Sequence, residues 1–218
     1  MSENRSPEQN RVGKVNREDY WRRKIAEERG TLTQEEFEKR WGAKFAEMER
    51  LRYIDPDTGL LTRRGLEHQL GIQVGQAKTR GISVAVIMLD LDGLKKVNDE
   101  ISHAEGNRAI KEMSNYFEEA SDGIGIPGRY GGDEFALVCP DKSLEEARLV
   151  AEKIRFNLKP HMKRKGFSVS TSVGLTALRD DNRKVPILLN EADAALKRAK
   201  KQGKDQVVVF SPEMLLAA

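Results

Sequence analysis

The stretch that most constrains the fold is the run from Ser83 to Leu91, which reads SVAVIMLDL. It is rich in β-branched residues and almost entirely apolar, which predicts a strand buried on both faces of a sheet. Asp90, within the run, and Asp92, just after it, break this pattern. A carboxylate at the edge of an apolar core costs free energy unless it is paired or bound to a cation. These two positions are therefore candidates for a functional site.

Composition narrows the class of protein. The chain has 218 residues, of which 38% are hydrophobic and 33% charged, enough for one domain with an appendage. Its longest apolar run falls far short of the roughly 20 residues that a membrane helix needs, and the first ten residues carry no signal-peptide core. The expectation is a cytoplasmic protein without a membrane partner. The single cysteine, Cys139, excludes an intrachain disulfide, and a net charge of +3 is too weak to indicate nucleic acid.

The chain divides into three parts. Residues 1–16 are polar and carry no apolar period, which predicts a flexible tail. Residues 17–54 are dense in charged, helix-forming residues and predict an N-terminal helical segment. The turn sequence from Asp55 to Gly59 then marks the start of a domain over 55–213.

Two helices are predicted in the N-terminal segment. Gly30 is expected to end the first, and Thr33 opens a capping box for the second. The second helix carries an apolar stripe at spacings of three and four: Phe37, Trp41, Phe45, Met48 and Leu51. Such a stripe must be buried, either on the following domain or against a second chain, and five positions are too few to predict a coiled coil.

The rest of the chain predicts an α+β fold, a sheet with helices packed on it. Helices are expected over 63–80, 105–120, 144–158 and 185–201, and strands over 83–91, 124–130, 134–139, 167–177 and 206–210. The second and third strands flank Gly131 and Gly132, which predicts a hairpin with Asp133 at its tip. The basic run 159–165 is interpreted as a solvated loop.

Further acidic residues, Asp133 and Glu134, follow the glycine pair. If the hairpin lies beside the apolar strand, Asp90 and Asp133 converge at one end of the sheet. Carboxylates at a shared point suit a hard cation such as Mg²⁺ and repel one another without it. Two such ions can activate an attacking oxygen and neutralise a triphosphate leaving group. For Asp92 alone, a turn-capping role is the stronger interpretation.

Five motifs in consistent order resemble the GGDEF-domain diguanylate cyclases. They are Asp55–Arg64 (DPDTGLLTRR), Asp90–Asp99 (DLDGLKKVND), Arg129–Phe135 (RYGGDEF), Ser170–Gly174 (STSVG) and Ala192–Lys200 (ADAALKRAK). The resemblance covers about residues 55–210. It implies a palm-like nucleotidyl-cyclase domain, with a mostly antiparallel sheet flanked by helices. It also implies a signalling nucleotidyltransferase that condenses two GTP into cyclic di-GMP and releases pyrophosphate.

The resemblance also implies roles for single residues. Asp90 and Asp133 would hold Mg²⁺, for which Mn²⁺ is a possible substitute, with the backbone carbonyl of Leu91. Glu134 would lie beside the attacking 3′-hydroxyl as metal ligand or proton acceptor. Asn98 would contact the guanine edge. The implied substrate-binding set is Leu94, Lys95, Asn98, Asn107, Gly131, Gly132, Lys200 and Lys204.

The sequence departs from the family pattern in several places. Asn107 stands where the family has an aspartate that accepts two hydrogen bonds from guanine, and an amide offers one acceptor and one donor. We therefore expect relaxed base choice, with ATP as a further substrate. Ser102 replaces a glycine, and Lys204 an arginine. The stretch Asp122–Gly125 lacks the family's arginine-x-x-aspartate site, which predicts no feedback inhibition there.

His103 matches a family histidine, and structural and catalytic roles both remain open for it. The family's chemistry needs two facing sites, which implies a homodimer with the N-terminal helices as the means of pairing or of receiving a signal from a partner protein. The alternative is a catalytically silent GGDEF-like module that binds nucleotide. A purely structural dimerisation protein would leave the carboxylates unexplained.

Overall fold

The computed structural model describes residues 17–215, so the predicted tail 1–16 lies outside the described residues. By internal contacts the chain forms two compact units, with the division between Glu49 and Arg50. No helix within 17–215 is long and apolar enough to span a bilayer.

The first unit contains a helical hairpin of α1 (Arg17–Thr31) and most of α2 (Gln34–Tyr53). The first helix ends at Thr31, one residue beyond the stop predicted at Gly30. The predicted capping box is confirmed: the Thr33 amide donates to the Glu36 carboxylate at 3.0 Å, and the Glu36 amide donates to Thr33 Oγ1 at 3.3 Å.

The apolar stripe of α2 is covered only in its first half. Trp41 is 1% exposed, and its indole N–H donates to Glu28 of α1 at 2.8 Å. The rings of Phe37 and Phe45 lie 6.3 and 5.9 Å from the Trp41 ring. Beyond it, Phe45 is 36% and Met48 51% exposed. Within the described residues, the second half of the stripe therefore remains largely uncovered.

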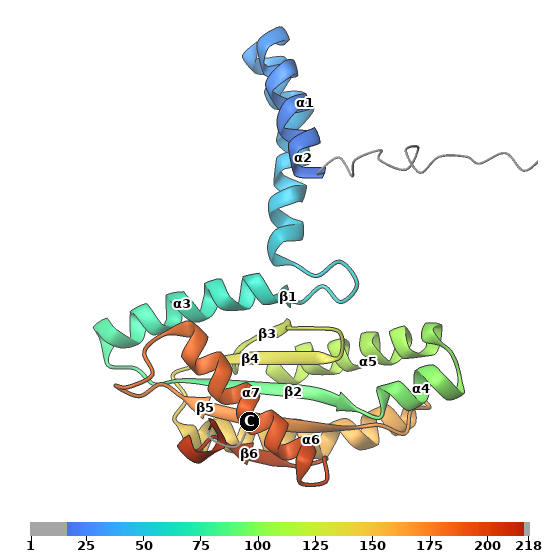
Figure 1. Ribbon diagram of the computed structural model, residues 1–218, viewed down its shortest axis with the longest axis vertical. Helices are drawn as coiled ribbons and strands as arrows, with labels where there is room; N and C mark the ends of the chain where they lie inside the picture. The colour runs from blue at the N-terminus through green and yellow to red at the C-terminus, as the bar shows by residue number, and fades with distance from the viewer. Residues whose placement is uncertain (1–16, 216–218) are drawn as a thin grey trace, which may run out of the picture. The chain divides into compact units, whose positions relative to one another are not determined.

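The second unit contains a six-stranded sheet in the order β1-β3-β4-β2-β5-β6. The strands are β1 (Leu61–Thr62), β2 (Val84–Asp92), β3 (Ile126–Arg129), β4 (Glu134–Pro140), β5 (Ser170–Ala177) and β6 (Val207–Val209). The central strand β2 is antiparallel to β4 and β5, and β3 is antiparallel to β4, whereas the edge strands β1 and β6 pair in parallel. The sheet is thus mixed and mostly antiparallel, and the α+β prediction is confirmed (Figure 1).

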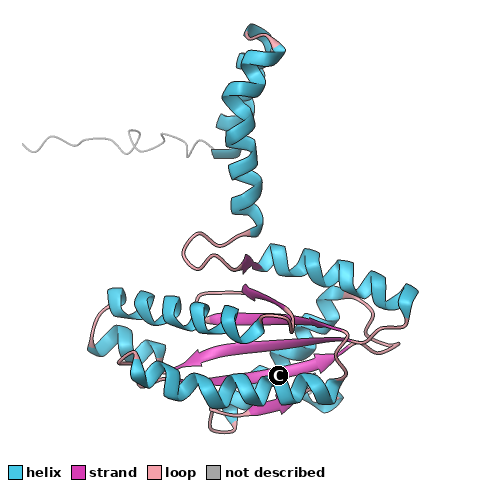
Figure 2. Ribbon diagram, turned by 180° about the vertical axis from the view of Figure 1, so that it is seen from behind, coloured by secondary structure: helices cyan, strands magenta, loops and turns pink. Residues whose placement is uncertain are grey.

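Five helices complete this unit, and helices cover both faces of the sheet (Figure 2). They are α3 (Arg63–Arg80), α4 (Leu94–Glu100), α5 (His103–Ser121), α6 (Leu144–Arg164) and α7 (Val185–Lys201), followed by a 3-10 turn at Pro212–Leu215. Sequence patterns missed α4 and β1, because segments of seven and two residues show no periodicity.

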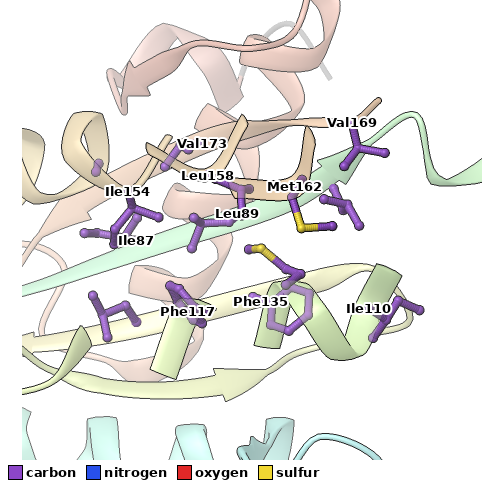
Figure 3. Packing of buried hydrophobic residues seen from close by; sticks show 14 of the residues in the cluster. Ile87, Leu89, Ile110, Phe117, Phe135, Ile154, Leu158, Met162, Val169 and Val173 are labelled. Atoms are coloured by element: carbon purple, nitrogen blue, oxygen red, sulfur yellow. The ribbon is translucent and has the colours of Figure 1, made fainter. Parts of the chain in front are cut away.

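The core has two layers, set by alternation along β2. Ile87 and Leu89 face α5 and α6, where they pack with Phe117, Phe135 and Ile154 (Figure 3). Val86 and Met88 face the opposite layer, formed with α3 and α7. Every residue of β2 is buried, as its apolar sequence predicted.

The prediction of a loop over 159–165 is wrong, because α6 continues to Arg164. Pro160 lies inside the helix and removes one backbone hydrogen bond, at a cost of about 3 kcal/mol. Leu158 and Met162 on either side of it are fully buried and continue the apolar face of the helix. Burial of this face therefore outweighs the proline.

Gly174 of β5 allows α7 to lie directly on the sheet. A Cβ at this position would come within 2.1 Å of the Leu196 amide nitrogen and 2.4 Å of the Ala192 carbonyl oxygen. We expect Gly174→Ala to lower the free energy of unfolding by about 3 kcal/mol or to prevent folding. Gly75→Ala, on an open face of α3, should instead stabilise by about 0.5–1 kcal/mol. Urea unfolding of both variants tests this, and equal effects would contradict it.

Candidate active site

The candidate site forms where β2 ends beside the start of β4. These strands are neighbours, and Asp90 pairs directly with Glu134. Residues paired in this way in an antiparallel ladder project on the same face. Here it is the face covered by α3 and α7, to which Val86 and Met88 also belong. The two carboxylates thus share one face at one end of the sheet.

The loop between β3 and β4 brings Asp133 to the same place. The Leu91 amide donates to the Asp133 carbonyl at 3.1 Å, which fixes the loop beside the end of β2. A Cβ at Gly131 would lie 2.8 Å from a Glu134 carboxylate oxygen, whereas a Cβ at Gly132 would meet nothing within 4 Å. Gly131 therefore makes room for the Glu134 side chain, and the backbone at Gly132 stays open to a ligand.

Asp90 is the electrostatic centre of the site. Its side chain is 9% exposed, and the Lys200 ammonium from α7 lies 2.5 Å from it. Burial raises the pKa of Asp90 to about 6, and the charges of Asp133 and Asp92 add to this, although the hydrogen bond from Lys200 acts in the opposite direction. Because burial and neighbouring negative charges disfavour the ionised form of Asp90, a further cation beside it would stabilise that form.

Asp92 is already saturated with hydrogen bonds. The Ser172 hydroxyl donates to it at 2.9 Å, the Ser170 hydroxyl at 3.2 Å, and the Asp205 amide at 3.2 Å. These bonds tie β2 to β5 and to the segment after α7. The structure thus favours a structural role for Asp92 over metal binding.

A magnesium ion fits this site only together with a ligand. Among the described residues, no three histidine, cysteine, aspartate or glutamate side chains lie close enough to hold a metal by themselves. Mg²⁺ in nucleotide sites is typically held by one or two carboxylates, with phosphate oxygens and water completing its shell. The pair Asp90 and Asp133 matches that donor set.

Arg63 and Tyr130 line the same pocket as Glu134, which the sequence did not predict. The pocket, of about 930 Å³, runs between α3 and α7. In its wall the Arg63 guanidinium lies 4.6 Å from the centre of the Tyr130 ring. Burial raises the pKa of Tyr130, and the Arg63 charge opposes this. Arg63 belongs to the motif Asp55–Arg64, but its position in that motif does not indicate that it shares a pocket wall with Glu134.

Four of the remaining predicted residues lie on α4 and α5. Asn98 packs against Gly106, where a Cβ would overlap its side-chain oxygen. Lys95 and Asn107 are exposed, and Leu94 is buried. Among the predicted substrate-binding side chains, Lys200 is the one that an ion pair joins to the carboxylates.

Two residues that depart from the family pattern lie at turns. Ser102 is the N-cap of α5, and its hydroxyl accepts from the Glu105 amide at 3.2 Å. Lys204 lies beyond α7 with a left-handed backbone, φ 65°. His103, the first residue of α5, is exposed.

Arg129 is a further functional residue that sequence reasoning passed over. It donates to the Gly132 carbonyl at 3.0 and 3.2 Å, to Asp55 at 3.2 Å and to Asp57 at 3.3 Å. Burial raises the pKa of Asp55, but hydrogen bonds from Thr58 and the charge of Arg129 outweigh it and lower this pKa overall. The turn that opens the domain thereby braces the glycine loop. The sequence did hint at the contact between Arg129 and Asp55, because each of these residues opens one of the five motifs.

Comparison with known proteins agrees with this geometry. A family profile described as "Diguanylate cyclase, GGDEF domain" matches residues 52–206. The response regulator PleD of Caulobacter vibrioides is 32% identical over 163 residues, which are 72% of this chain and 36% of PleD. The diguanylate cyclase DgcP of Pseudomonas aeruginosa is 31% identical over 158 residues, 71% of this chain and 23% of DgcP. The chain thus matches about a third or less of these relatives.

Solved structures show the same fold. The diguanylate cyclase SiaD from Pseudomonas aeruginosa, in complex with its activator SiaC, has a TM-score of 0.68 at 31% identity, covering 88% of this chain and 75% of SiaD. The GGDEF domain of DgcB from Caulobacter crescentus, in complex with c-di-GMP, has a TM-score of 0.67 at 24% identity, covering 72% and 95%.

The raised pKa of Asp90 predicts that the free energy of unfolding depends on pH. Since its pKa rises from 3.8 to about 6 on folding, the native protein holds a proton between these values that the unfolded chain has lost. Its contribution to stability is therefore full below the unfolded pKa and falls as the pH rises through the folded pKa. In EDTA, the free energy of unfolding of the wild type relative to Asp90→Asn should fall by about 1–2 kcal/mol from pH 4 to pH 7.5.

Urea unfolding across this pH range measures the difference. The same measurement on Asp180→Asn, at an exposed position, is the control. A flat or rising difference for Asp90→Asn would contradict the electrostatic account of the site.

Proposed function

The chain belongs to the GGDEF family, and from this premise we propose that it is a magnesium-dependent diguanylate cyclase acting as a homodimer. One observation carries the proposal. Asp90 of β2 pairs with Glu134 of β4. The Lys200 ammonium lies 2.5 Å from the Asp90 carboxylate, and the loop that holds Asp133 is hydrogen-bonded to Leu91, the residue after Asp90. A dimerisation protein would not need a buried aspartate whose pKa is raised by burial and by the charges of neighbouring acidic residues.

Each residue has a defined task in this proposal. Asp90 and Asp133 hold Mg²⁺, which would neutralise charge on the triphosphate. Glu134 lies on the same face and accepts the proton of the attacking 3′-hydroxyl. Lys200 exchanges its contact with Asp90 for the phosphates once cation and nucleotide arrive. The open backbone at Gly132 admits the nucleotide, and Asn98 and Asn107 recognise the base.

The homodimer follows from the chemistry. Each domain binds one nucleotide and supplies one 3′-hydroxyl, so two sites must face each other. The exposed half of the α2 stripe, which includes Phe45 and Met48, offers an apolar surface for pairing. SiaD was solved in complex with its activator SiaC, and we propose that a partner protein controls this chain too, with the N-terminal helices as the segment that receives its signal.

The proposed activity predicts a specific reaction product. With Mg²⁺ and GTP the protein should release pyrophosphate and form cyclic di-GMP, and EDTA should abolish both. Asp133→Asn should reduce the rate at least about 100-fold, because it removes a metal ligand, whereas Asp180→Asn should leave it unchanged. Mass spectrometry and a pyrophosphate assay measure this. Nucleotide binding without pyrophosphate release would instead indicate the silent module.

A separate prediction concerns the choice of nucleotide base. We propose that Asn107 relaxes the choice between guanine and adenine, so that the wild type also uses ATP. Asn107→Asp restores two acceptors for guanine and should raise the preference for GTP over ATP about 10-fold or more. Asn157→Asp on α6 makes the same change at a remote position and is the control. An unchanged GTP-to-ATP ratio, or no use of ATP by the wild type, would contradict this proposal.

A further inference from the structure

Two large apolar side chains project from the outer face of α6. Leu149 and Phe156 are each 71% exposed, the highest values among the large hydrophobic side chains that the structure describes. They are seven residues apart, so they lie on one side of the helix, two turns from each other. The inner face of α6 is buried separately, through Ala151, Ile154 and Leu158. The exposed pair therefore adds little to the core, and its spacing indicates an interaction surface.

Charged side chains are sorted by sign along the same helix. Residues 144–152 contain three glutamates and one arginine, whereas residues 153–164 contain five lysines and arginines and no acidic residue. The helix dipole favours this order, but its effect is confined to the first and last turns. It does not account for the change of sign in the middle of the helix, at Glu152 and Lys153. A partner that carries the opposite order of charges would match α6.

The α6 helix of a second copy carries that order when it runs antiparallel. With a two-fold axis between residues 152 and 153, Leu149 lies opposite Phe156 of the second copy, and Phe156 lies opposite its Leu149. The same axis sets Glu152 opposite Lys153 of the second copy. A parallel helix would instead set Glu152 against its own copy. The sequence of the face is thus complementary to itself in the antiparallel direction.

The two central charges are accessible for this pairing. Lys153 is exposed and has no ion pair with a described residue. Glu152 lies 3.0 Å from Arg155 on its own helix and is 41% exposed. A surface pair of this kind contributes little to stability, so it does not prevent Glu152 from meeting a second cation.

The surface is small, and the association should accordingly be weak. Two helix turns from each copy bury less than the roughly 800 Å² per partner that stable complexes need. Where another contact already joins two copies, however, the second contact is intramolecular, at an effective concentration of about 1 mM. A weak contact is then sufficient to fix how two domains meet.

The α6 face lies on the opposite side of the sheet from the candidate site. Asp90 and Glu134 share the face covered by α3 and α7, whereas α6 packs with α5 on the other layer of the core. Two domains joined through α6 therefore have their candidate sites on outward-facing sides. This arrangement differs from the facing sites that the proposed reaction needs.

We propose that the outer face of α6 is a self-association surface. It receives α6 of a second copy in antiparallel orientation, with Leu149 and Phe156 as its apolar centre, and it holds the two candidate sites apart.

Cysteine cross-linking of the full chain tests the proposal. Cys139 is the only cysteine and is buried, so one introduced cysteine can be cross-linked selectively. Lys153→Cys places a thiol next to the two-fold axis and keeps both apolar contacts. With a short bis-maleimide it should give at least about 5-fold more covalent dimer on a denaturing gel than Lys78→Cys. Lys78, an exposed lysine of α3, is the matched control.

A second substitution tests the apolar contact. Phe156→Glu, added to Lys153→Cys, should lower the yield to the level of Lys78→Cys, because it places a charge opposite Leu149. Ile101→Glu, which alters a 62% exposed residue outside α6, is the control and should leave the yield unchanged. Thermal unfolding and the rate of reaction with N-ethylmaleimide verify that the variants are folded and their thiols equally accessible.

The cross-linking needs neither cation nor nucleotide, so its result is separate from that of the product assay. Equal yields from Lys153→Cys and Lys78→Cys would overturn the self-association surface, even if the wild type makes cyclic di-GMP. A high yield from Lys153→Cys that Phe156→Glu does not reduce would also overturn it. A high yield that Phe156→Glu abolishes and Ile101→Glu preserves supports it, even if the wild type makes no product.

Discussion

The structure depends on the antiparallel pairing of β2 with β4, which carries Asp90 to the end of a fully buried strand opposite Glu134. Asp90 is one of nine buried residues in β2, and its side chain is 9% exposed. Its charge is instead met by Lys200, and its pKa stays raised to about 6. Folding thus places a carboxylate where it is destabilising without a cation, and this links the sheet directly to the chemistry we propose.

Other parts of the second unit maintain this arrangement. Gly174 allows α7 to lie on β5, which sets the position of Lys200. Arg129 fastens the glycine loop to the turn at Asp55, so that Asp133 remains beside Leu91. Asp92 holds the strained segment that carries Lys204. Each contact joins segments far apart in the sequence, and each acts on a different charged group of the site.

The sequence predicted the elements with strong periodicity and the identity of the central strand. The buried run of β2 and the glycine pair of the hairpin predicted that Asp90 and Asp133 converge on the condition that the two strands are neighbours, and the sheet order meets this condition. The end of α6 was less predictable, because Pro160 is a local signal for ending a helix and the helix continues to Arg164. Pro160 was overridden by burial of Leu158 and Met162, which only the tertiary structure reveals. Arg63 and Arg129 were missed because their partners are distant along the chain.

The central claim is that Asp90 and Asp133 hold a divalent cation together with the nucleotide. Electron paramagnetic resonance of Mn²⁺, titrated into the protein with α,β-methylene GTP, tests it most directly. The account predicts tightly bound Mn²⁺ in the wild type only when the nucleotide is present, and its loss in Asp90→Asn. The same bound Mn²⁺ signal in Asp90→Asn, or none in the wild type with nucleotide, would contradict the account.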